Sequence, residues 1–215
     1  MTVVMVMNDF DLPVGSTASL AGVLAAIPFA QGFPIWVGVS AALGIGALGG
    51  VLNGVLVAEL GILPFVATLG TQTIFSGLAF FISGGATIFG RDIPKPFAEF
   101  SRLDIPLDAL GLAEMKLPYL TLVAVLVLLV VWILKEHTSY GRRLYANGGN
   151  IGAAHLAGVR VRRLRLSAFA VTGFGAAVAG LMFASRVASA NPTQGAGLML
   201  DAIAAVATSS PGRQG

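Results

Sequence analysis

Uncharged hydrogen-bonding side chains are gathered inside long apolar stretches of this sequence. The stretch TLGTQTIFSG, residues 68–77, concentrates hydroxyl and amide groups close to several phenylalanines, and the apolar run before it contains one amide. Hydroxyls, amides and aromatic faces together suit transient binding of a neutral, hydroxylated solute such as a sugar. The alternative is structural, because Ser and Thr also bond to the backbone or to neighbouring helices in membrane bundles. The candidate residues for a solute path are Asn53, Thr68, Thr71 and Gln72.

The sequence contains no arrangement of residues typical of an enzyme active site. The two histidines, His137 and His155, lie in a basic stretch without carboxylate partners at metal-ligand spacing, and cysteine is absent. The glycines near residue 150 do not follow the GxxxxGKS/T spacing of a phosphate-binding loop. We therefore expect no catalytic, cofactor-binding or metal-binding residues, and we assign any ATP hydrolysis to a separate subunit.

A basic stretch, Lys135–Arg165, separates two apolar runs and holds seven of the thirteen Lys and Arg residues against one acid, Glu136. Cations concentrated beside membrane-spanning ends mark the side of the membrane that is not translocated. Residues 135–165 are therefore predicted to form a cytoplasmic loop. A net charge of +3 could also suggest nucleic acid, but the loop has no interleaved stacking aromatics, so no nucleic-acid partner is expected.

A short helix is predicted inside this basic loop. Asn147–Gly149 predicts a turn, Asn150 is a favourable N-cap, and Gly158 is a favourable C-terminal stop. Small residues on the helix surface, such as Ala153 and Ala154, suit docking into a groove of a soluble partner. The alternative is a topological anchor that has no partner.

The composition is that of a membrane protein. Hydrophobic residues make up 56% of the 215 and charged residues 11%, whereas soluble domains carry about 25% charged residues. A helix needs about 20 mostly apolar residues to cross a bilayer core. Five apolar runs approach this length, at 16–33, 35–58, 62–83, 117–134 and 166–184. The predicted fold is all-α: a polytopic membrane helix bundle in one domain, 1–215, with about five membrane helices, a short cytoplasmic helix and close packing through the 28 glycines.

Alternation from the cytoplasmic loop places residues 84–116 on the external side. This external loop contains Pro94, Pro96 and Pro106 together with short apolar pieces. Such a composition favours short turns or an interfacial helix over a loose linker. A solvated spacer between two membrane helices is the alternative.

Two acids, Asp9 and Asp11, precede the first apolar run. Carboxylates near a helix start complement its exposed N–H groups, so we expect them to support a helix that begins at Ser16 or Thr17. The alternative is an ion or proton site, which more often lies in the middle of a helix. No carboxylate lies within an apolar run, which argues against an ion-coupled secondary transporter.

Three segments resemble the permease subunits of bacterial ABC importers for simple sugars, the family of ribose, xylose and arabinose permeases. They are FDLPVGSTASLAGVLAA from Phe10, GGVLNGVLVAELGILPFVATLGTQTIFSGLAFFISGG from Gly49, and the stretch from Tyr140 to Val206. The resemblance implies a transport protein, not an enzyme, that translocates a pentose-like or hexose-like sugar across the bacterial cytoplasmic (inner) membrane. It also implies four partners besides the sugar: an ABC ATPase subunit, a periplasmic sugar-binding protein facing the external loop, a second permease copy and membrane lipid.

The same resemblance implies that residues 147–159 form the coupling helix that contacts the ATPase subunit. Its candidate residues are Asn147, Gly148, Asn150, Ala153, Ala154, Gly158 and Val159.

The chain also differs from this family at its ends. Family members have two membrane helices before the first matching segment and continue past DAIAAV with further helices, whereas ATSSPGRQG follows here. The sequence is therefore expected to be truncated at both ends, and a non-functional permease fragment is the alternative function. Pro13 stands where family members usually have Ser, a change that a helix start tolerates.

Overall fold

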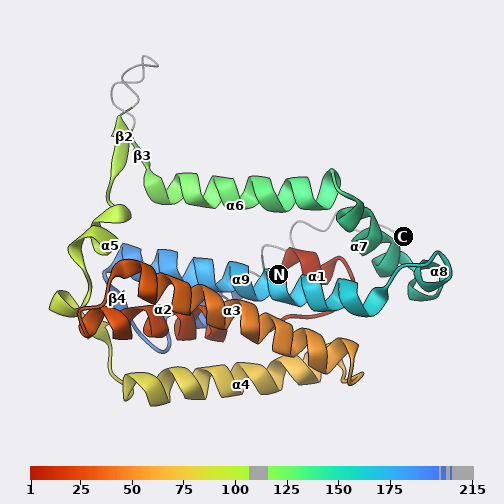
Figure 1. Ribbon diagram of the computed structural model, residues 1–215, viewed down its shortest axis with the longest axis horizontal. Helices are drawn as coiled ribbons and strands as arrows, with labels where there is room; N and C mark the ends of the chain where they lie inside the picture. Colours follow the sequence, from red (N-terminus) through yellow and green to blue (C-terminus); the bar gives the residue numbers. More distant parts are fainter. Residues whose placement is uncertain (107–115, 199, 202–203, 205–215) are drawn as a thin grey trace.

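The computed structural model describes residues 1–106, 116–198, 200–201 and 204, and its long helices share one axis direction (Figure 1). The middle of the predicted external loop and the C-terminal ATSSPGRQG lie outside the described residues. The long helices are α2 (Val14–Ala30), α3 (Ile35–Ala58), α4 (Pro64–Ser83), α6 (Tyr119–Glu136) and α9 (Val161–Val187). The short ones are α1 (Thr2–Met5), η1 (Gly90–Asp92), α5 (Lys95–Phe100), α7 (Ser139–Gly149) and α8 (Ile151–Leu156). Strand β1 (Ile88–Phe89) pairs with β4 (Ser189–Ala190), and β2 (Asp104–Pro106) pairs with β3 (Lys116–Pro118), both antiparallel.

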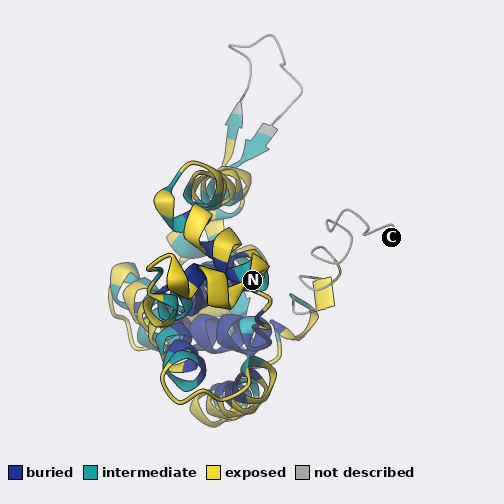
Figure 2. Cartoon of the chain, turned by 90° about the vertical axis from the view of Figure 1, so that its right-hand side faces the viewer, coloured by how far each residue is buried: buried dark blue, intermediate teal, exposed yellow. Residues whose placement is uncertain are grey.

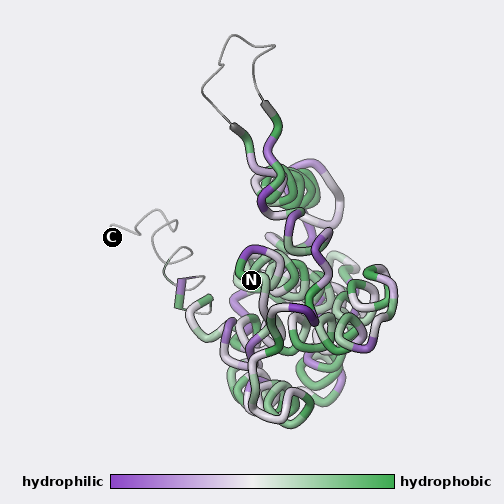
Figure 3. Tube along the Cα trace, turned by 90° about the vertical axis from the view of Figure 1, so that its left-hand side faces the viewer, coloured by the Kyte–Doolittle hydropathy of each residue, from purple (hydrophilic) through white to green (hydrophobic). Residues whose placement is uncertain are grey.

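Four of the described helices, α3, α4, α6 and α9, are long and apolar enough to cross a membrane, and α2 is a shorter apolar helix of 17 residues. Figure 3 shows hydrophobic residues along the helices and hydrophilic residues mainly in the connecting segments. The predicted all-α membrane bundle is confirmed, and α3 has the predicted bounds. α9 begins at Val161 rather than at 166, because arginine is a good helix former and its long side chain carries the charge away from the apolar part.

α2 is the central helix of the bundle. Its buried residues extend from Gly15 to Phe29, and it packs against α3, α4 and α9. Figure 2 shows the buried residues gathered in the interior, with exposed residues around them. The sequence of α2 is rich in Ala, Gly and Ser, and these small side chains let several neighbours approach it closely.

α3 and α9 pack backbone against backbone through glycine. Gly46, Gly50 and Gly54 recur every four residues and therefore share one face of α3. A Cβ added to Gly50 would lie 2.2 Å from the carbonyl oxygen of Phe169, and one added to Gly173 of α9 would lie 2.3 Å from the carbonyl oxygen of Gly46. The predicted packing through small residues is confirmed for this helix pair.

α6 lies at the side of the bundle (Figure 1). None of its residues is buried, and its main contacts are with α7 at one end and β3 at the other. Its side chains are mostly apolar on every face, as expected for a helix surrounded by lipid or by other membrane helices rather than by water.

The described part of the predicted external loop is folded against the end of α9. Ser185 Oγ donates a hydrogen bond of 2.6 Å to the carbonyl oxygen of Phe97 in α5. The ring of Phe97 also lies 5.0 Å, between centroids, from that of Phe29 at the end of α2. Short elements packed on the bundle therefore form this part of the loop, as its prolines and apolar pieces predicted.

The N-terminal acids do not cap α2, so this prediction is wrong. α2 begins at Val14, with Pro13 before it, and makes no side-chain cap hydrogen bond. Asp9 instead faces α9, where its Oδ2 lies 3.0 Å from Arg165 Nε and its Oδ1 accepts a hydrogen bond of 3.2 Å from Arg165 Nη2. Burial raises the pKa of the Asp9 carboxyl, and the neighbouring Arg165 charge lowers it by less. The carboxylate is thus paired with a cation that is far away in the sequence.

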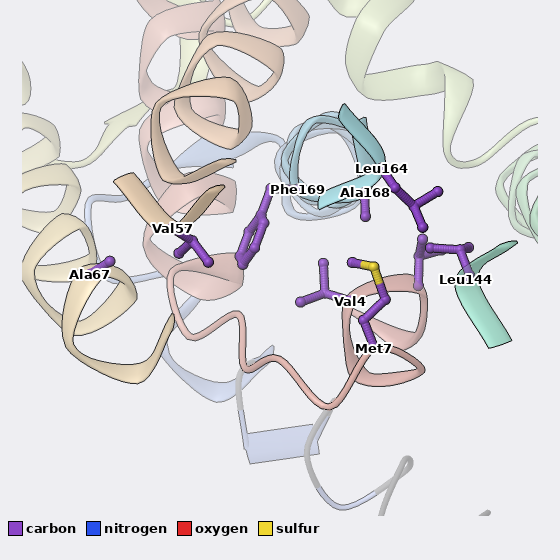
Figure 4. Close-up of a cluster of buried hydrophobic side chains, with 9 residues drawn as sticks. Val4, Met7, Val57, Ala67, Leu144, Leu164, Ala168 and Phe169 are labelled. Carbon is purple, nitrogen blue, oxygen red and sulfur yellow. The ribbon is translucent and has the colours of Figure 1, made fainter. Parts of the chain in front are cut away.

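An apolar cluster holds the N-terminal segment between α7 and α9. Figure 4 shows Val4 and Met7 beside Leu164 and Ala168 of α9 and Leu144 of α7. All five side chains are buried. The first residues of the chain are therefore part of the core at the α8 end of the bundle.

Candidate functional site

Two of the four candidate path residues, Asn53 and Thr71, link α3 to α4, and a third, Thr68, bonds within α4. Thr71 Oγ1 donates a hydrogen bond of 2.7 Å to Asn53 Oδ1, and both residues are buried. Thr68 Oγ1 donates to the carbonyl oxygen of Pro64, one turn earlier in α4, at 2.7 Å. These polar groups are satisfied inside the bundle, which agrees with the structural alternative for them.

Gln72, the fourth candidate, lines a cavity of about 160 Å³ between α2, α4 and the segment that follows β4. The cavity has room for about ten water molecules. Its polar lining comes from hydroxyl and amide side chains, and no charged residue contributes among the residues that the structure describes. The described lining residues are Gly15, Ser16, Ser19, Gln72, Ser76, Phe80, Pro192, Thr193, Gly195 and Ala196.

Two helices present their polar groups to this cavity. Ser16 and Ser19 are three residues apart and therefore share one face of α2. Gln72 and Ser76 are four residues apart and share a face near the middle of α4. The cavity consequently lies inside the membrane bundle rather than at either end of it.

The third wall is a non-helical segment, 191–195, that packs closely on α2. The Gly195 N–H donates a hydrogen bond of 2.8 Å to Ser19 Oγ, so the Ser19 hydroxyl proton is still available to a guest. A Cβ on Gly195 would lie 1.9 Å from the carbonyl oxygen of Gly15, so only glycine fits there. Asn191 Nδ2 donates to Thr87 Oγ1 at 2.8 Å and fastens the start of the segment.

Sequence reasoning named Gln72 as a candidate and placed Ser76 in the polar stretch 68–77, but it did not identify Ser16, Ser19 or Thr193 as lining residues. The spacing of Ser16 and Ser19 is a usable signal, since it puts two hydroxyls on one face of a mainly apolar helix. Thr193 carries no such signal, because it lies outside the predicted apolar runs and reaches the cavity only through the fold.

At the α8 end of the bundle, Asn147 and Gly148 belong to α7, so the predicted turn at 147–149 is wrong. Asn147 is fully buried, and the carbonyl oxygen of Gly148 accepts a hydrogen bond of 2.8 Å from Asn8 Nδ2. A Cβ on Gly148 would lie 1.9 Å from the carbonyl oxygen of Val6. Contact with the N-terminal segment therefore keeps these residues helical. Their predicted contact with an ATPase subunit stays a prediction.

The short predicted helix exists as α8, Ile151–Leu156. Asn150 caps it, since its Oδ1 accepts a hydrogen bond of 3.0 Å from the Ala153 N–H. Gly158 follows with φ +79°, a left-handed conformation that favours glycine. Both predicted boundaries are confirmed.

The outward face of α8 differs from the predicted set. Ala153 is exposed, but Ala154 is buried and Val159 is half-buried. Leu156, which was not among the candidates, is 90% exposed. Within the described part of the chain, no group of His, Asp and Glu residues could hold a metal ion.

Relatives with curated names resemble this chain over nearly its whole length. It is 36% identical over 206 residues to the ribose import permease protein RbsC of Haemophilus influenzae, a match that covers 96% of this chain and 62% of RbsC. It is 38% identical over 205 residues to the autoinducer 2 import system permease protein LsrC of Salmonella typhimurium, covering 95% of this chain and 56% of LsrC. The chain thus spans less than two thirds of the length of these relatives. No solved structure matches it significantly.

The family described as branched-chain amino acid transport system / permease component matches residues 1–209. The long apolar helices agree with a multi-pass membrane protein, and the relatives are named as import permeases. The predicted resemblance to the permeases of sugar importers is confirmed. This chain belongs to the family of transport-system permease components.

Proposed function

We propose that this chain acts as the permease subunit of an ATP-binding-cassette importer and translocates a simple sugar across the cytoplasmic membrane. The observation that carries the proposal is the uncharged polar cavity inside the bundle, lined by Ser16, Ser19, Gln72, Ser76 and Thr193. Hydroxyl and amide groups exchange hydrogen bonds with a polyol, and their modest strength allows release as well as entry. The proposed solute is therefore a neutral, hydroxylated molecule such as ribose.

The family description names branched-chain amino acids, which carry both an ammonium and a carboxylate. Burying such charges without charged partners is costly. The described lining residues of the cavity supply no charged side chain, which favours the sugar over the amino acid.

Gln72→Leu is expected to lower uptake of radiolabelled D-ribose about tenfold, because an unpaired solute hydroxyl would be left in the cavity. The measurement uses cells that express the permease together with its ATPase and binding protein. Thr73→Val is the matched control, since Thr73 is exposed on the same helix and its Oγ1 donates to the carbonyl oxygen of Leu69. Equal uptake by both variants, or saturable uptake of leucine instead of ribose, would contradict the proposed solute.

The proposed ATPase contact is the exposed face of α8. An apolar side chain that is 90% exposed in a basic segment, Leu156, is suited to insertion into an apolar pocket of a partner. A second permease copy and a periplasmic sugar-binding protein complete the proposed assembly.

Leu156→Glu is expected to weaken retention of the ATPase subunit during purification by at least about tenfold, because a charge would enter an apolar contact. The measurement is the ratio of ATPase to permease after affinity capture from membranes. Leu60→Glu is the control, since Leu60 is also an exposed leucine. It follows Glu59, which pairs with Arg162, so it lies at the same end of the bundle as α8. If wild-type chain inserts but retains no ATPase, this chain does not act as a permease subunit, and the fragment alternative holds.

A further inference from the structure

Three arginines converge on one cavity at the α8 end of the bundle. The cavity has a volume of about 490 Å³ and lies between α7, the residues after α8, and the start of α9. Arg143 comes from α7, Arg160 directly precedes α9, and Arg163 lies in the first turn of α9. The fold therefore brings together cations that are up to twenty residues apart in the sequence.

The other arginines of the basic stretch are engaged elsewhere. Arg162 pairs with Glu59 at 3.1 Å and Arg165 pairs with Asp9 at 3.0 Å. Arg142 Nη2 donates a hydrogen bond of 2.7 Å to Ser139 Oγ. Among the described residues, no carboxylate forms an ion pair with an arginine of the cavity. Three like charges around one cavity repel one another, and an anion bound in the cavity would offset this repulsion.

The remaining walls suit a phosphate group at a membrane surface. Ser167 Oγ lies 3.0 Å from the Tyr140 hydroxyl oxygen and 2.9 Å from the carbonyl oxygen of Leu164, and both hydroxyl residues line the cavity beside the arginines. The cavity also lies beside the first turn of a membrane-spanning helix, and that turn contains no acid. The positive end of the helix dipole adds to the attraction of an anion. The buried Leu164 gives the cavity an apolar wall as well.

We propose that this three-arginine cavity binds the phosphodiester headgroup of an anionic phospholipid. Guanidinium groups bind phosphate oxygens with paired hydrogen bonds, and clusters of them next to membrane helices attract anionic lipid. Free inorganic phosphate shares this chemistry, but the position beside a membrane-spanning helix favours the lipid, whose acyl chains stay in the bilayer. The site is separate from the solute cavity, and its lining includes Gly158 and Val159 of the predicted coupling set.

The test compares lipid binding by two triple variants of the purified chain. The cavity variant is Arg143→Gln, Arg160→Gln and Arg163→Gln; the control is Arg142→Gln, Arg162→Gln and Arg186→Gln, which removes the same charge elsewhere. Binding of fluorescent phosphatidylglycerol is titrated in detergent, with phosphatidylcholine and inorganic phosphate as the other probes. We expect the dissociation constant for phosphatidylglycerol to rise about tenfold or more in the cavity variant and to change less than about twofold in the control.

Each other outcome overturns the proposal. Equal weakening in both variants would mean that overall positive charge, not the cavity, attracts the lipid. If inorganic phosphate displaced fluorescent phosphatidylglycerol when both were present at the same concentration, the cavity would be assigned to a free anion. Loss of ATPase retention with unchanged lipid binding would assign the arginines to a protein interface. Size-exclusion profiles in phosphatidylcholine and detergent confirm that both variants are folded before the titrations are compared.

Discussion

Replacing Gly50 with valine is expected to destabilise the native bundle strongly. The added Cβ would lie 2.2 Å from the carbonyl oxygen of Phe169 and 2.8 Å from the Cα of Ala170. Both obstacles are backbone atoms, so no change of rotamer relieves the clash, and α3 has to move away from α9. Separation also opens the contacts of Gly46 and Gly54, so the loss is expected to exceed the usual overpacking cost of about 1–3 kcal/mol.

The measurement is the yield of monodisperse protein in detergent, together with its melting temperature by size exclusion. A loss of about 3 kcal/mol lowers the melting temperature of a chain of this size by roughly 10 °C. Gly44→Val is the matched control, because Gly44 lies on the same helix and nothing lies within 4 Å of an added Cβ. Equal behaviour of the two variants would show that the glycine face of α3 does not pack on α9 as described.

Replacing Arg165 with methionine is expected to destabilise the chain by about 3–5 kcal/mol at pH 8, because it leaves the buried carboxylate of Asp9 without its partner. Asp9 is 4% exposed, so water does not replace the lost guanidinium. Burial already raises the pKa of Asp9, and removal of the positive charge raises it further.

This cost depends on pH in a defined direction. When folding raises the pKa of a carboxyl, the folded state binds a proton at a higher pH than the unfolded state does. The folded variant is therefore destabilised at the pH values at which Asp9 must be ionised. The penalty is complete above the raised folded-state pKa and disappears as pH falls toward the ordinary value. The melting temperatures of wild type and Arg165→Met should therefore converge as the pH is lowered from 8 to about 5.

Arg162→Met provides the control for this ion pair. Its partner, Glu59, is exposed, and such surface pairs contribute about 0–1 kcal/mol. We expect a small change that does not vary over the same pH range. A loss for Arg165→Met as small as that of the control, or one that grows at low pH, would mean that Asp9 is hydrated in the folded protein.

The composition and the length of the apolar runs determined the fold class and the main helices. α3 coincides with an uninterrupted run, because both of its ends are set locally, by Pro34 before it and Glu59 after it. The ends of α8 were also predictable, since a side-chain cap at Asn150 and a left-handed glycine at 158 act over a few residues. Family membership was likewise predictable, because the order of the segments is a property of the sequence.

Other features depended on contacts between distant residues. Asn147–Gly149 has the composition of a turn, but its packing against Asn8 and Val6 keeps it helical. Tertiary packing often overrides a local preference of this size. Asp9 was expected at a helix start for the same local reasons and is instead paired with Arg165.

The candidate solute site was also partly predictable from the sequence and partly dependent on tertiary contacts. The sequence by itself determined that neutral polar groups lie within membrane helices, because their residue types and their position in apolar runs are enough to establish it. Only the tertiary structure decided which of them line a cavity: Thr71 is hydrogen-bonded to Asn53, whereas Gln72, the next residue, lines the cavity together with Ser16 and Thr193. The physical reason is that adjacent helical residues point in directions about 100° apart, so helix rotation and the position of segment 191–195 determine which side chains meet.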